Sequence, residues 1–188
     1  LTLIAASLLL SSTLAAQAGT VYTGTIDVTD LPQLGRIFRD SIASVASAPK
    51  AYPGINSPGV AFVYDVYTIT NTSGTPIQVT AVFSNTSANS IHITLHSGTY
   101  DPNNQGVNYL GDCGGSSISG TLKGCSVMVP ASTNYDLVIF NAGTGLYGDY
   151  ALTLYTSAAN NAPVLDNTGT TILSAVAQDV PDGSNPGN

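Results

Sequence analysis

One stretch of the sequence, DPNNQGVNYLGD, carries oxygen-bearing side chains at the spacing of a calcium-binding loop. Positions 1, 3, 5 and 12 of that pattern are Asp101, Asn103, Gln105 and Asp112. Gln at position 5 and Asp at position 12 depart from the usual ligands, and the flanks predict strands where a calcium loop has helices. The alternative is a loop between strands in which Asp101 bonds to its own backbone in an Asx turn. The sequence favours this turn and keeps calcium as the second interpretation.

Two histidines, His92 and His96, are four residues apart, and on a helix this spacing would bring both to one zinc ion. The surrounding SIHITLHS alternates between apolar and polar residues, which predicts a strand. On a strand the two histidines share a face but lie about 13 Å apart, at ~3.3 Å per residue. We therefore expect no metal site here, with the apolar residues facing the core and both histidines facing solvent.

Signatures of catalysis are missing from the sequence. It contains no G-x-S-x-G elbow, no H-E-x-x-H pair and no glycine-rich phosphate loop. A paired-carboxylate glycosidase would have to use two Asp, because the chain has no Glu. We expect no enzyme activity and no cofactor, with calcium as the one exception to test.

The densest charge cluster contains Arg36, Arg39 and Asp40. Because arginine binds carboxylates bidentately, the cluster could contact an anionic glycan or a partner domain. The favoured alternative is an intramolecular ion pair that pins this segment to the edge of the fold. Tyr109 and other tyrosines could stack on sugars, although tyrosine is also a common strand residue. Arg36, Arg39 and Tyr109 are the predicted contact surface.

The two cysteines, Cys113 and Cys125, are twelve residues apart. An even number of cysteines in an exported chain predicts a disulfide, whereas a metal site would need His or more Cys nearby. Closing so short a loop stabilises a fold by about 3 kcal/mol in the chain-entropy model.

Composition and periodicity together predict an all-β fold. All eleven acidic residues are Asp, only four residues are basic, and the net charge is −7, which makes nucleic acid or an anionic membrane an unsuitable partner. Asp, Gly, Ser, Thr and Asn favour turns and strands over helices. Alternating runs bounded by turn residues occupy 59–72, 76–83, 90–97, 126–130, 135–140 and 149–155. Their spacing predicts an antiparallel β-sandwich of the jelly-roll kind. Only residues 34–45 have a weakly helical pattern.

The chain divides into three predicted regions. Residues 1–18 have the apolar run and small-x-small ending of a signal peptide without its basic n-region, with a retained membrane helix as the alternative. Residues 19–156 form the β-sandwich domain, and residues 157–188 are a linker and the start of a following domain. We therefore expect a secreted or cell-surface protein with no membrane span in its mature chain.

Several pieces in order resemble the pre-peptidase C-terminal domain family of bacterial extracellular proteins. They are GRIFRD (35–40), Pro49-Lys50 with Pro53-Gly54, YDVYTITNT (64–72), NYLGD (108–112) and GDYALTL (148–154). Ala46 and Tyr52 stand where such sequences often have a cysteine pair. NNAPVL (160–165) resembles the start of the cadherin-like or immunoglobulin-like repeats of large bacterial surface proteins.

These resemblances imply a non-catalytic extracellular module at the amino terminus of a multidomain surface protein, with an adhesion or attachment role. The implied partners are a glycan or cell-surface protein and the neighbouring repeats of the same chain. The alternatives are an accessory domain of a secreted hydrolase, which assists folding or substrate contact, and a carbohydrate-binding module.

Overall fold

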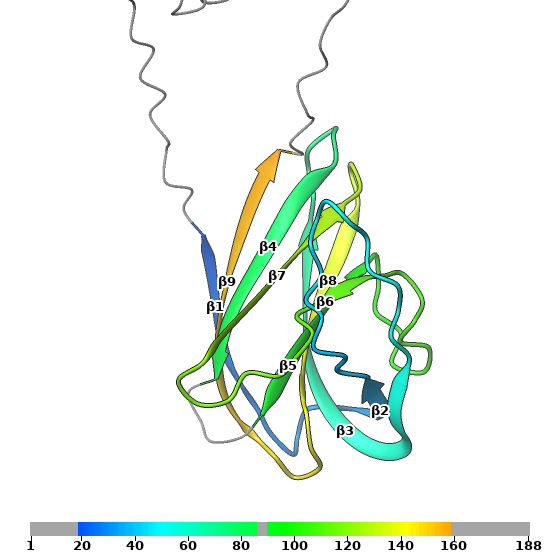
Figure 1. Ribbon diagram of the computed structural model, residues 1–188, viewed down its shortest axis with the longest axis vertical. Coiled ribbons are helices and arrows are strands. Elements are labelled where there is room, and N and C mark those ends of the chain that lie inside the picture. The colour runs from blue at the N-terminus through cyan, green and yellow to red at the C-terminus, as the bar shows by residue number, and fades with distance from the viewer. Residues whose placement is uncertain (1–18, 86–89, 159–188) are drawn as a thin grey trace, which may run out of the picture.

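In the computed structural model, residues 19–85 and 90–158 are described, and they form two antiparallel sheets packed face to face (Figure 1). The strands are β1 (Thr20–Ile26), β2 (Leu31–Ile37), β3 (Ile55–Thr70), β4 (Ile77–Asn85), β5 (Ile91–Ser97), β6 (Tyr109–Asp112), β7 (Leu122–Val129), β8 (Asn134–Asn141) and β9 (Gly148–Ala158). Their order is β1-β9-β4-β7 in the four-stranded sheet and β2-β3-β8-β5-β6 in the five-stranded sheet. Over these residues no helix has the length and apolar character needed to cross a membrane.

The strand pairs are nested in the manner of a jelly roll. With β2 set aside, β1 pairs with β9, β3 with β8, β4 with β7 and β5 with β6. The first strand thus pairs with the last, the second with the last but one, and so on inward, which is the double Greek key of that fold. β2 extends the five-stranded sheet beyond β3. The predicted all-β sandwich is confirmed.

The main core lies between the sheets and follows from the alternation in the sequence. Val79, Ala81 and Phe83 point inward from β4, opposite Ile93 of β5 and Leu137 of β8. Each is almost fully buried, and each of the side chains larger than that of Ala81 contributes about 1.5–3 kcal/mol of hydrophobic stabilisation. The predicted segments from 59–72 to 149–155 each coincide with one of these strands.

The weak helix predicted at residues 34–45 is wrong. Its first residues belong to β2, where the pairing register with β3 shifts between Leu34 and Arg36. Gly35 lies at this shift with φ 72°, a left-handed conformation that favours glycine and does not continue a right-handed helix. The residues beyond Ile37 form an irregular segment that leads to β3.

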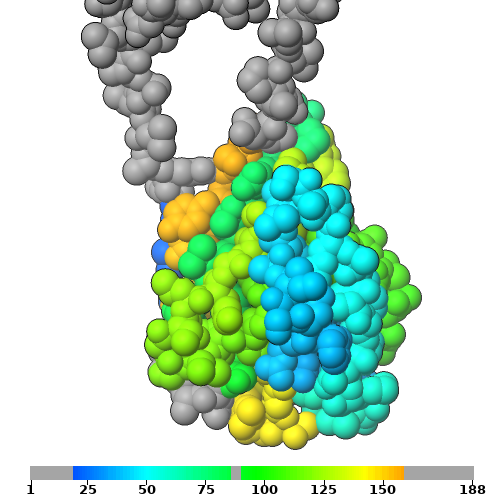
Figure 2. Space-filling view, viewed as in Figure 1, coloured from blue at the N-terminus to red at the C-terminus, as the bar shows by residue number. Residues whose placement is uncertain are grey.

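This segment, residues 38–54, is hereafter called the strap, and it crosses the edge where the two sheets end at β6 and β7 (Figure 2). The Ser44 N–H donates to the Asp112 carbonyl, and the Ser44 carbonyl accepts from the Ser126 N–H, each at 2.9 Å. The Ser41 N–H donates to the Gly114 carbonyl at 2.9 Å. The strap therefore satisfies backbone groups on both edge strands and closes this side of the sandwich.

A second, smaller core lies on the outer face of the five-stranded sheet. Val138 and Phe140 of β8 and Tyr64 of β3 pack there with Ile37 and Tyr100. Tyr52 of the strap and Tyr109 at the start of β6 complete this layer. As a result, β5 and β8 are buried on both faces.

The prediction that His92 and His96 face solvent is therefore wrong. Both side chains do point to the outer face of the sheet, but both residues are 0% exposed. Alternation along β5 correctly separates the two faces, whereas the extra layer over the outer face comes from distant parts of the chain.

Candidate functional site

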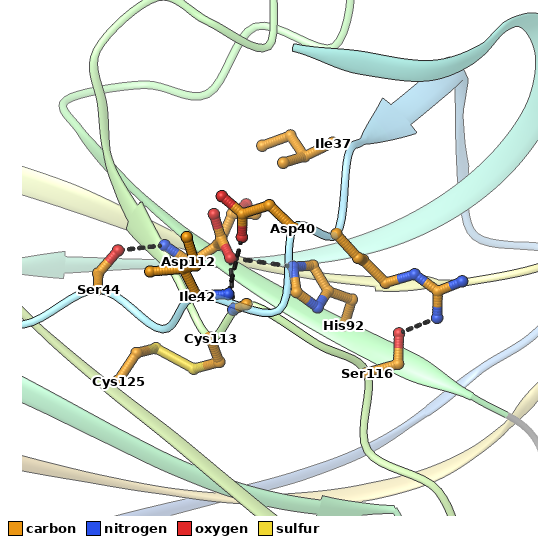
Figure 3. Close-up of polar contacts among 12 residues, drawn as sticks. Ile37, Asp40, Ile42, Ser44, His92, Asp112, Cys113, Ser116 and Cys125 are labelled. Atoms are coloured by element: carbon orange, nitrogen blue, oxygen red, sulfur yellow. Dashed lines mark hydrogen bonds and ion pairs between the residues drawn. A yellow bond between two sulfur atoms is a disulfide. The ribbon is translucent and has the colours of Figure 1, made fainter. Parts of the chain in front are cut away.

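The most concentrated chemistry lies beneath the strap, in a group hereafter called the Asp112 cluster: Asp112, Lys50, Asp40, Tyr109, His92 and Ser44. Figure 3 labels four of them, Asp112, Asp40, His92 and Ser44. Lys50 extends from the strap, and its Nζ lies 2.8 Å from Asp112 Oδ2 and 2.7 Å from Asp40 Oδ1. Its third hydrogen-bond acceptor is the Ile42 carbonyl at 2.6 Å. The amine therefore has an acceptor for each of its N–H groups.

Asp112 is the centre of the cluster and is fully buried. The Tyr109 hydroxyl donates to its Oδ2, and the Gly114 N–H donates to its Oδ1. Burial opposes ionisation of this carboxyl group, but nearby His92 and the hydrogen bonds from Lys50 and Tyr109 outweigh it and lower its pKa to about 2. Burial and the bond to Asp112 raise the pKa of Tyr109, so that its hydroxyl stays protonated.

His92 and His96 differ in their hydrogen-bond partners. His92 packs edge-on against Phe140, and its Nε2 lies 3.6 Å from Asp112 Oδ1, too far for a good hydrogen bond. His96 contacts Thr94 Oγ1 through Nε2 at 3.0 Å and the Val107 carbonyl through Nδ1 at 3.3 Å. Burial lowers the pKa of His96 to about 4. His96 is therefore neutral at pH 7, with Nδ1–H donating to Val107.

Within the calcium pattern, Asp101 bonds to Asn103, whereas Gln105 and Asp112 have partners elsewhere. Asp101 Oδ1 accepts from the Asn103 N–H at 2.9 Å, which is the Asx turn expected from the sequence. Gln105 is buried, and its amide donates to the Gly35 carbonyl at 3.2 Å. Asp112 lies in its own cluster. Within the described residues no three His, Cys, Asp or Glu side chains are arranged to hold a metal ion. Calcium binding stays a prediction.

The predicted contact residues are less available than the sequence suggests. Arg36 is only 8% exposed, lies over the Phe62 ring and donates to the Ile37 carbonyl at 3.1 Å. Burial and the neighbouring Arg39 lower its pKa to about 10. Arg39 donates to Ser116 Oγ at 2.7 Å (Figure 3). The carboxylate of Asp40 forms its ion pair with Lys50 and not, as the sequence had suggested, with an arginine.

The predicted disulfide between Cys113 and Cys125 is confirmed. Cys113 directly follows β6 of the five-stranded sheet, and Cys125 lies in β7 of the four-stranded sheet. The bond therefore links the two sheets at the edge that the strap covers (Figure 3).

The sequence does not predict two of the polar groups. Lys50 belongs to a Pro-Lys pair in the sequence, but its partner Asp112 is 62 residues away. At the other side of the sandwich, the Tyr150 hydroxyl donates to Asp65 Oδ2 at 2.7 Å and contacts the Tyr67 hydroxyl at 2.7 Å. No periodic signal marks either group, since both depend on pairing between distant strands.

Two hollows border these groups. A cavity of about 140 Å³ lies between the strap, β6 and β7, bordered by Pro49, Lys50, Tyr109 and Met128. It is smaller than the roughly 300–1,000 Å³ of typical ligand pockets. A larger depression of about 370 Å³ lies over β1 and β9, beside Thr25 and Asp149. The Asp112 cluster is thus an internal feature of the fold.

Comparisons with known proteins give distant structural similarity and no family. No family model matches the chain, and no curated protein matches it. Infectious bursal disease virus VP2 from a subviral particle superposes with a TM-score of 0.33 at 14% identity, over 87% of this chain and 38% of that one. A Podospora anserina GH26-CBM35 beta-(1,4)-mannanase gives 0.32 at 10% identity, over 76% of this chain and 28% of that one. CBM35 from Cellvibrio japonicus Abf62 gives 0.27 at 14% identity, over 74% and 99%.

Proposed function

We propose that this chain contains a non-catalytic extracellular β-sandwich module with an adhesion or attachment role, carried by an exported protein. The observation that supports this proposal is that the outer face of one sheet is covered by other parts of the chain, whereas the outer face of the other sheet is not. The strap and the loop before β6 bury the outer face of the five-stranded sheet, whereas the outward side chains of β4 stay half-buried. Among residues 19–85 and 90–158, the second face is the broad surface left for contact.

This surface, hereafter called the bare face, suits a glycan. Its outward side chains are Val21, Thr23, Thr25, Gln78, Thr80, Val82, Ser84, Ala151, Thr153 and Tyr155. Hydroxyl and amide groups exchange hydrogen bonds with sugar hydroxyls, and Tyr155, which is 37% exposed, offers a ring for stacking. We therefore propose a glycan as the partner in preference to a cell-surface protein.

The resemblances noted in the sequence fit the same role. A pre-peptidase C-terminal-like module followed by surface-protein repeats would present this face outside the cell, and the disulfide suits an oxidising compartment. The residues proposed for the signal peptide and for the following repeat lie outside those the structure describes. As an accessory domain of a secreted hydrolase or a carbohydrate-binding module, the chain would use the same face to contact a substrate.

A glycan array probed with the labelled protein tests the proposal. We expect binding to a subset of glycans, and we expect Thr153→Arg, which places a long charged side chain between Val21 and Val82, to abolish it. The matched control is Val107→Arg, at a residue 41% exposed in the loop before β6. The control should bind as the original protein does.

Three results would count against this function. Equal loss of binding in both variants would exclude the bare face as the contact surface. Binding to target cells that survives removal of their glycans would replace the glycan with a protein partner. Hydrolysis of a bound glycan would contradict the non-catalytic role.

A further inference from the structure

The contact between Lys50 and Asp112 brings an amine and a carboxyl group together in the interior of the protein. The side chains are 9% and 0% exposed, and Nζ lies 2.8 Å from Oδ2. A second carboxyl group, that of Asp40, lies 2.7 Å from the same Nζ. The chain therefore places a nucleophile, an acyl group and a proton acceptor within contact of one another, away from bulk water.

We propose that Lys50 and Asp112 condense to an amide, which joins the strap to β6 through an intramolecular cross-link. The reaction is R–NH₃⁺ + R′–COO⁻ → R–NH–CO–R′ + H₂O, and it needs neither an oxidant nor a cofactor. One C–N bond forms between Lys50 Nζ and Asp112 Cγ, and one C–O bond of Asp112 breaks.

The neighbouring groups supply the proton transfers. Asp40 accepts a proton from the Lys50 ammonium, which frees the nitrogen lone pair for attack on Cγ. The Tyr109 hydroxyl and the Gly114 N–H donate to the two oxygens of Asp112 and stabilise the charge that develops there. Asp40 returns this proton to the departing oxygen and then passes on a second proton from the attacking nitrogen, so that the oxygen leaves as water. Asp40 ends the reaction as it began.

Burial and proximity favour this reaction over the stable salt that amines and carboxylic acids form in water. Burial by itself raises the pKa of the Asp112 carboxyl group and so acts against its charged form. Fixed contact between reacting groups corresponds to effective concentrations of roughly 10⁵–10⁸ M. The hydrogen bonds that keep Asp112 ionised oppose the reaction, and we therefore expect it to be slow. One turnover in the lifetime of each molecule is sufficient.

Mass spectrometry of the purified full chain tests the cross-link. After reduction of the disulfide, the intact mass should be about 18 Da below that of the uncondensed chain, the mass of one water. Trypsin cleaves after lysine only when its amine is free. It should therefore leave Lys50–Ala51 intact and release residues 40–123 as a single piece that is also about 18 Da light.

Three variants make the result specific. Lys50→Arg keeps the positive charge but cannot condense, and it should show no mass loss. Asp112→Asn should condense with release of ammonia, a loss of about 17 Da. Asp40→Asn removes the proton acceptor and should slow or abolish the loss. A chain of full mass that trypsin cleaves after Lys50 overturns the proposal and leaves an ion pair, as does a deficit that persists in Lys50→Arg.

Discussion

The outer faces of the two sheets differ in how they are covered, although both belong to the same jelly roll. On the five-stranded sheet, β5 and β8 place histidine, threonine and aspartate beside apolar residues, and a second layer buries them all. On the four-stranded sheet, β4 places mainly small polar side chains outward, and they remain half-buried. Polar residues on the outward side of a strand are therefore buried on one sheet and partly exposed on the other within the same fold.

The comparison shows on which face the polar side chains contribute to the stability of the fold. A buried polar group costs free energy unless it has a partner, and the covered face supplies one for Asp112, Asp136 and His96. The same types of residue on the bare face can bond to water. Substitutions on the covered face should therefore be costly, and those on the bare face should be tolerated by the fold while they alter contact with a partner.

The largest effect is expected from Asp112→Ala. This change leaves Lys50 and Tyr109 buried without their shared acceptor, and removing one partner of a buried pair costs about 3–5 kcal/mol. Denaturation with urea should show a lower midpoint concentration and a free energy of unfolding that is smaller by this amount. A loss below about 1 kcal/mol would mean that water reaches the cluster and that the covered face resembles the bare one.

Loss of the disulfide should have the second-largest effect on the free energy of unfolding. Cys113→Ala combined with Cys125→Ala removes the link between the sheets without leaving a free thiol. The free energy of unfolding should fall by about 3 kcal/mol. Urea denaturation of this variant, compared with the oxidised and the reduced parent protein, measures it. A variant that matches the oxidised protein would show that the strap alone secures this edge.

The covered face should also give the protein a particular pH dependence. The pKa of His96 falls from 6.5 to about 4 on folding, so its neutral form stabilises the fold above pH 6.5, and up to about 3 kcal/mol is lost as the pH falls from 6.5 to 4. The pKa of Asp112 falls from 3.8 to about 2, and its contribution is lost only between those values. His96→Gln should flatten the change in melting temperature between pH 7 and 4. Parallel curves for variant and parent would assign the effect to another group.

The smallest effect on stability is expected on the bare face. Thr153→Ala removes a half-buried hydroxyl from the centre of β9. Its free energy of unfolding should stay within about 0.5 kcal/mol of the parent protein. A clearly larger loss in the same urea experiment would indicate that the bare face has an unrecognised structural role.

The sequence predicts the inner faces of the sandwich much better than the outer ones. Strands such as β4 and β9 follow from alternation, because one side of each packs against the opposite sheet. The burial of His92 and His96 does not follow, since period two separates the faces without revealing what covers them. The sequence offers one hint of this covering layer, namely the aromatic residues, such as Tyr52 and Tyr100, in segments that form no strand. The Asp112 cluster was missed for the related reason that its members are distant in sequence.

The pairing of β1 with β9 determines how the module responds to force. Thr20 pairs with Leu154 and Ile26 with Gly148, so the chain enters and leaves the sandwich at the same end (Figure 1). A pull on these two ends acts along the hydrogen bonds between the strands and opens them one residue pair at a time, like a zipper. Tension would therefore separate β1 from β9 while the disulfide and the strap bear none of the load. Such a sandwich is mechanically suited to attachment through one of its two ends, because tension between both ends would open the pairing of β1 with β9 first.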